Sequence, residues 1–181
     1  MKKTHPRGFT IYELLIIVGI IGILSSIVVM RFSGTTNPID LSNGQAVLTS
    51  DLSKIINWSQ TGKIEPTTNT VPLGYGLVFF PGEKYYYLYA DYDADNLYSK
   101  NSSDVLLETV DLEKGELVRN VLIQTCTPLS ATGTCDFLVT YENAKMYTNG
   151  QRDDNLEIIL HHEKDNANAT VLVNIISGQI N

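Results

Sequence analysis

The sequence predicts an α+β fold: a long N-terminal hydrophobic helix, expected to be transmembrane, leads to a globular head of one helix packed on antiparallel β-sheet. Three observations predict this arrangement. Residues 14–30 carry no charge and are mostly Leu, Ile and Val. Apolar residues between positions 39 and 58 recur at helical spacing, and beyond position 71 they alternate between turn signals, as strands do.

The apolar run over residues 9–30 would form a helix of about 33 Å, enough to cross a hydrocarbon core of about 30 Å. Lys2, Lys3 and Arg7 precede this run, and Arg31 is the only charge just after it. Basic residues are retained on the cytoplasmic side of a membrane. The charge pattern therefore predicts a single-pass protein with a cytoplasmic N-terminus and an extracytoplasmic head.

A joint is expected after this run, because Ser33, Gly34 and Pro38 disfavour a continuous helix; an unbroken helix is the alternative. The next helix is predicted over residues 39–58, and Gly62 provides a stop signal. Its apolar positions fall on one helical face: Val47, Leu48, Leu52, Ile55 and Ile56.

Strands are expected in the rest of the chain, and Pro81 and Gly82 predict a hairpin turn between the first two. The expected strands span residues 75–80, 85–90, 105–110, 117–125, 136–141, 156–162 and 170–176. The whole chain then divides into a leader (1–8), the hydrophobic helix (9–31), a joint with an amphipathic helix (32–62) and a β-rich head (63–181).

The sequence RGFTIYELL occupies residues 7–15, where the basic leader meets the apolar run. A leader that ends in Gly8, followed by Phe9 and then by Glu13 within the apolar helix, resembles the N-terminus of type IV pilins and of type II secretion pseudopilins. The resemblance implies that a prepilin peptidase cleaves between Gly8 and Phe9 and methylates the new terminal amine of Phe9. An uncleaved signal-anchor is the alternative.

The same resemblance implies a role for Glu13 in assembly, through pairing with the terminal amine of a neighbouring subunit in a filament. A carboxylate in an apolar environment is costly, and an opposite charge nearby removes much of that cost. Substitution of Glu13 by Ala is then expected to spare insertion and cleavage but to block assembly.

A second, looser resemblance concerns the head, where GYGLVFF leads into YYLYADYDADNLYS and the chain closes on VLVNIISGQI. These segments are similar to minor pseudopilins of the H type and to FimT-like minor pilins. Together the resemblances imply a structural subunit of a type IV pilus or type II secretion filament. Its implied partners are other pilin or pseudopilin subunits, prepilin peptidase, an inner-membrane assembly platform and membrane lipid. The alternative is a non-polymerising, single-pass, membrane-anchored binding module that keeps Met1.

The composition argues against two function classes. The formal net charge is −7 over 181 residues, and removal of the leader with Lys2, Lys3 and Arg7 leaves −10. An acidic chain without clustered Lys and Arg is not expected to bind nucleic acid. The sequence contains no GxSxG motif, Walker loop or Ser/His/Asp arrangement, so we expect no enzyme activity.

Two cysteines, Cys126 and Cys135, flank the segment TPLSATGT, in which Pro128 and Gly133 indicate a turn. The turn lets the two ends approach each other, and an extracytoplasmic compartment permits a disulfide. We therefore expect a Cys126–Cys135 bridge, with two free thiols as the alternative. The pair offers too few ligands for a zinc site.

Asp91, Asp93 and Asp95 alternate in ADYDADNLYS, as do the first ligands of a calcium loop. An EF-hand would then need Gly and Glu where this chain has Asn96 and Ser102, so that motif is excluded. A turn at a strand end is the favoured interpretation, and no cofactor is expected. A calcium site of another kind, formed by these three residues with or without Asp104, is the alternative.

Overall fold

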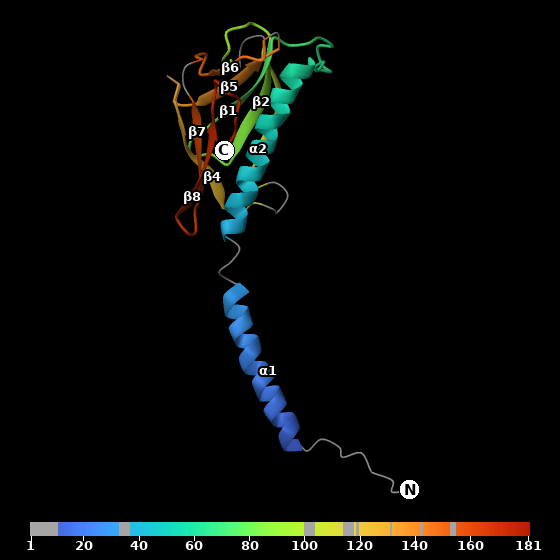
Figure 1. Ribbon diagram of the computed structural model, residues 1–181, viewed down its shortest axis with the longest axis vertical. Coiled ribbons are helices and arrows are strands. Elements are labelled where there is room, and N and C mark those ends of the chain that lie inside the picture. Colours follow the sequence, from blue (N-terminus) through green and yellow to red (C-terminus); the bar gives the residue numbers. More distant parts are fainter. Residues whose placement is uncertain are drawn as a thin grey trace, which may run out of the picture. The chain divides into compact units, whose positions relative to one another are not determined.

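The computed structural model describes residues 11–32, 37–99, 104–113, 118, 120–130, 132–141, 143–152 and 155–181 (Figure 1). The chain forms two compact units, Met1–Thr36 and Asn37–Asn181. Within the described residues, the first unit contains helix α1 and the second contains helix α2 and eight strands.

Helix α1 spans Ile11–Phe32. The expectation of a transmembrane stem is wrong: among the described residues, no helix is both long enough and apolar enough to cross a membrane.

The predicted fold class is also corrected in the second unit, whose bulk is β-sheet. Its strands in chain order are β1 (Gly74–Phe79), β2 (Tyr85–Asp91), β3 (Val105–Asp111), β4 (Val121–Thr127), β5 (Cys135–Thr140), β6 (Met146–Thr148), β7 (Leu156–His162) and β8 (Ala167–Val173). In the described part of the chain they form two antiparallel sheets. The larger sheet has the order β3-β2-β1-β5-β6, and the smaller sheet has the order β4-β7-β8.

Helix α2 spans Asn37–Thr61 and lies against both sheets (Figure 1). Pro38 falls in its first turn, where a missing N–H costs nothing, and Gly62 ends it in the left-handed conformation, with φ of 65°. One face of α2 is buried in the main core through Leu41, Leu48, Leu52 and Ile55. The amphipathic spacing of the sequence therefore matches a helix that packs on sheet.

Both faces of the larger sheet are buried near its centre. On the inner face, Tyr75, Leu77 and Phe79 of β1 join the main core with α2. On the outer face, Val78, Tyr89 and Leu138 form a second, smaller cluster. This explains why every residue of β1 is buried, whereas a strand with one solvated face alternates between buried and exposed residues.

The two edge strands of the smaller sheet, β4 and β8, each form backbone hydrogen bonds with residues outside that sheet. On the β4 side, Ile123 donates its N–H to the carbonyl oxygen of Glu83 and accepts a bond from the Gly82 N–H, so the β1–β2 turn rests on this strand. On the β8 side, Leu172 and Asn181 exchange two backbone bonds, of 2.8 and 2.9 Å.

Candidate functional site

Of the three residues that the sequence singled out near the N-terminus, the structure describes one, Glu13. Gly8 and Phe9 lie outside the described residues. Glu13 lies in the first turn of α1. The neighbouring side chains of Ile11 and Tyr12 are more than four-fifths exposed, at 84% and 82%.

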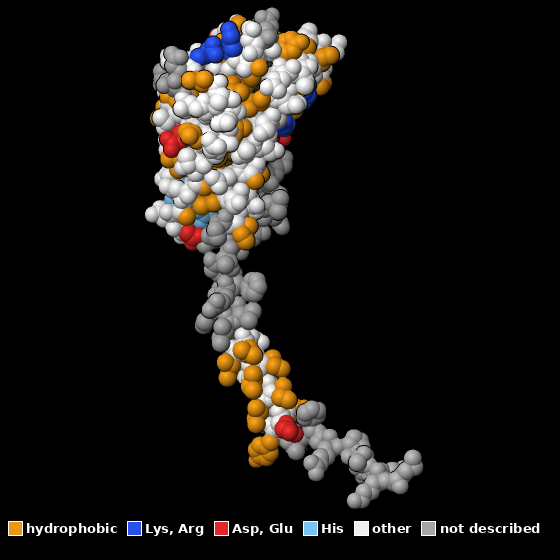
Figure 2. Space-filling model, viewed as in Figure 1, with side chains coloured by type: hydrophobic (Ala, Val, Ile, Leu, Met, Phe, Trp, Pro, Cys, Tyr) orange, Lys and Arg blue, Asp and Glu red, His pale blue; other side chains and the backbone are white. Residues whose placement is uncertain are grey.

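The described side chains of α1, residues 11–25, are all exposed, and Figure 2 shows apolar side chains along the face of the helix in view. The large ones are Ile11, Tyr12, Leu14, Leu15, Ile16, Ile17, Val18, Ile20, Ile21, Ile23 and Leu24. A contiguous apolar surface of this kind marks a site that another apolar surface covers. The arrangement suits helix-to-helix packing between chains.

A second candidate site is the loop between β2 and β3, where the sequence places alternating aspartates. Asp91 ends β2, and its Oδ1 accepts the backbone N–H groups of Asp93 and Ala94 at 3.0 and 2.9 Å. At the other end of the loop, the Ser99 N–H donates to Oδ2 of Asp104 at 2.8 Å. Short polar side chains that accept backbone N–H groups fold such loops locally.

Three carboxylates of this loop converge. One oxygen from each of Asp91, Asp93 and Asp104 lies within 4.8 Å of the others. Asp95 is not in this group: its side chain is exposed, and its Oδ1 accepts the Leu97 N–H at 2.8 Å. The structure therefore brings together two of the three aspartates that the alternating pattern singled out, and adds Asp104 from the far end of the loop.

Two further polar groups lie under this loop, and neither was among the site residues expected from the sequence. Tyr89 of β2 is 0% exposed and Asp136 of β5 is 4% exposed, both on the outer face of the larger sheet. The ring of Tyr98, from the loop, packs on that of Tyr89 with centroids 5.2 Å apart. A signal for Asp136 did exist, because CDFLV places a carboxylate inside an apolar strand.

Burial dominates the electrostatics of these carboxyl groups. It raises the pKa of Asp136 to about 7, with repulsion from Asp104 and Asp95 adding to the effect. Burial and the charges of Asp93 and Asp91 raise the pKa of Asp104 to about 6. Burial also raises the pKa of Asp91, against the opposing effect of its two N–H donors. Each anion is thus less stable here than in water.

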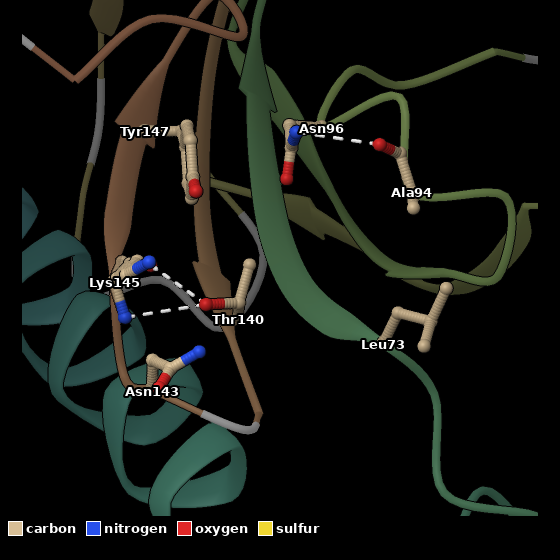
Figure 3. Close-up of a pocket in the computed structure, with 7 residues that line it drawn as sticks. All are labelled: Leu73, Ala94, Asn96, Thr140, Asn143, Lys145 and Tyr147. Atoms are coloured by element: carbon tan, nitrogen blue, oxygen red, sulfur yellow. Dashed lines mark hydrogen bonds between the residues drawn. The ribbon is translucent and has the colours of Figure 1, made fainter.

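A shallow pocket of about 250 Å³ lies beside this loop (Figure 3). Its lining residues are Leu73, Ala94, Asn96, Thr140, Asn143, Lys145 and Tyr147. Two local hydrogen bonds lie in this pocket: the Lys145 N–H donates to Thr140 Oγ1 at 3.2 Å, and Asn96 Nδ2 donates to the Ala94 carbonyl at 3.3 Å.

Cys126 and Cys135 form a disulfide, with an S–S distance of 2.09 Å and Cα atoms 6.1 Å apart. Both residues are fully buried. Because Cys126 belongs to β4 and Cys135 to β5, the bridge joins the smaller sheet to the larger one.

No protein-family model, no curated protein and no solved structure matches this chain.

Proposed function

We propose that this protein is a structural subunit of a type IV pilus-like or type II secretion filament, a minor pilin or pseudopilin. In this proposal prepilin peptidase cleaves the chain after Gly8 and methylates Phe9, and an inner-membrane assembly platform adds the mature subunit to its neighbours. The folded unit Asn37–Asn181 is then the extracytoplasmic head.

The observation that carries the proposal is the sequence RGFTIYELL at residues 7–15, which combines a basic leader, Gly8 and Glu13. The exposed apolar side chains of α1 support it, because packing against the same helix of other subunits would remove them from water. The disulfide supports export of the head, since such bonds persist in oxidising compartments.

The mature N-terminus tests this proposal. Protein recovered from cells that express the native assembly machinery should begin at Phe9 and carry a methylated amine, as read by N-terminal sequencing and intact mass. A chain that still begins at Met1 would contradict processing and would favour a non-polymerising binding module.

A matched pair of variants shows whether the processing is specific. Gly8→Val places a branched side chain at the cleaved bond, where close approach of the peptidase needs a bare backbone, so cleavage should be lost. Thr4→Val makes a similar change within the leader but away from the bond, and cleavage should persist. Equal processing of both variants would show that Gly8 does not define the site.

A further inference from the structure

We propose that the loop between β2 and β3 binds a calcium ion through the carboxylates of Asp91, Asp93 and Asp104. The proposal concerns the folded head alone and does not depend on filament assembly.

The first argument is geometric. Calcium binds oxygen ligands at about 2.3–2.6 Å, so two oxygens on one ion lie at most about 5 Å apart. One oxygen from each of Asp91, Asp93 and Asp104 already meets this limit, with all three within 4.8 Å of one another. The structure brings these groups together from the described parts of the loop, residues 91–99 and 104.

The second argument concerns two buried oxygens on the sheet face beneath the loop, outside the carboxylate cluster. Oη of Tyr89 and Oδ1 of Asp136 have no hydrogen-bond partner among the described residues, and these side chains are 0% and 4% exposed. Buried polar atoms without a partner are costly and uncommon. Both residues belong to the outer sheet face that the loop covers, and the charges of Asp136, Asp91 and Asp104 all act on the Tyr89 hydroxyl.

Asp91 connects the two arguments. Its Oδ1 is used by the loop backbone, whereas its Oδ2 is buried and has no hydrogen-bond partner in the part of the chain that the structure describes. The side chain is 1% exposed, so water does not solvate this charge freely. A bound cation would supply the missing partner.

The chemistry of the ligands favours calcium. All the candidate ligands are oxygens, which suit hard cations and exclude a thiolate or imidazole site for zinc. Magnesium requires near-ideal octahedral geometry and keeps several waters, whereas calcium accepts irregular sets of carboxylates. Three converging carboxylates exceed the one or two that magnesium usually takes from a protein, so this set fits calcium better than magnesium.

The test is calorimetric titration of the full chain, kept in mild detergent and freed of metal with a chelator. Calcium chloride should bind at one site per chain and raise the melting temperature, because a ligand specific to the folded state stabilises it. Asp91→Asn and Asp93→Asn should each weaken binding by at least about tenfold, since calcium affinity follows the number of ligand charges. The amide oxygen that Asp91→Asn introduces can still accept the loop N–H groups, so the loop should survive.

Glu83→Gln is the matched control, because it removes one exposed carboxylate at the opposite end of β2 and should leave binding unchanged. If Asp91→Asn fails to fold, the proposal is tested with Asp93→Asn, because Asp93 is exposed and its replacement should not prevent folding. The absence of heat and of a melting shift with calcium at several millimolar would overturn the proposal, as would equal weakening by Glu83→Gln. Equal affinity for magnesium would overturn the choice of ion.

Discussion

At the scale of single residues, Gly76 determines how the outer face of the larger sheet packs. Gly76 of β1 pairs with Tyr89 of β2, and the tyrosine ring lies where a side chain at position 76 would be. A Cβ built on Gly76 would lie 2.5 Å from Cε1 of Tyr89 and 2.7 Å from its hydroxyl oxygen. The buried ring therefore requires glycine at this position.

Gly76→Ala should lower the free energy of unfolding by about 1–3 kcal/mol, because overpacking displaces a fully buried ring. Urea denaturation measures the effect. Gly44→Ala is the control: a Cβ there would meet its nearest neighbour, Leu160 Cδ1, at 3.4 Å, and alanine favours the helix, so stability should not fall. Equal stability of the parent and Gly76→Ala would contradict the packing described for Tyr89.

Asp136 should make the metal-free protein less stable as pH rises. Its pKa is raised to about 7 from an ordinary 3.8, so the folded state holds the proton more tightly than the unfolded state does. The free energy of unfolding should therefore decrease between about pH 4 and 7, by a few kcal/mol at most, since one pKa unit corresponds to about 1.4 kcal/mol. Above about pH 7 it should level off.

Asp136→Asn should remove the part of this pH dependence that lies nearest pH 7, as measured by denaturation at several pH values with a chelator present. Asp104, whose pKa is raised to about 6, should leave a residual slope at lower pH in the variant. A variant that follows the parent curve up to pH 7 would show that Asp136 is not the group responsible.

At the scale of elements, the disulfide joins β4 and β5, which belong to different sheets. Replacement of Cys126 and Cys135 together by Ser should lower the free energy of unfolding by about 2–3 kcal/mol, because the closed loop no longer restricts the unfolded chain. Chemical denaturation of both proteins, with and without reductant, measures this. Reductant should destabilise the parent and leave the double variant unchanged, and a parent indifferent to reductant would contradict the prediction.

Much of the element order could be predicted from the sequence, because local patterns determine it. The spacing of Leu48, Leu52 and Ile55 indicated α2, and alternation indicated most strands to within a few residues. β6 was missed, since three residues are too few to show alternation. β4 begins at Val121 rather than 117 and contains a bulge near Ile123, which breaks the period-two pattern.

The division into two sheets and the acidic cluster could not be predicted in the same way. β1 pairs with β5, and β4 pairs with β7, so both sheets depend on contacts between distant segments. The position of Asp104 beside Asp91 depends on how the loop folds over Tyr89, which no local spacing encodes. The alternating spacing predicted Asp95 as a third ligand. Its carboxylate instead accepts a hydrogen bond from the Leu97 N–H within the loop.

At the scale of the whole molecule, the proposed filament role predicts that Glu13 acts in assembly and not in the folding of the second unit. Glu13→Ala should leave cleavage and the melting temperature of the head unchanged, because Glu13 belongs to α1 and not to the second unit. It should abolish incorporation into filaments, as measured by immunoblotting of sheared filament fractions. Glu83→Ala is the control for loss of one negative charge, and normal incorporation of Glu13→Ala would contradict the role proposed for this carboxylate.

The backbone bonds along the smaller sheet restrict how such heads can meet. An exposed strand edge is a template on which another chain can add a strand, and this is a common route to aggregation. Here Ile123 on one side and Leu172 on the other already hold backbone partners from their own chain. At these positions, heads in the proposed filament would therefore meet through side chains and not by adding a strand to this sheet.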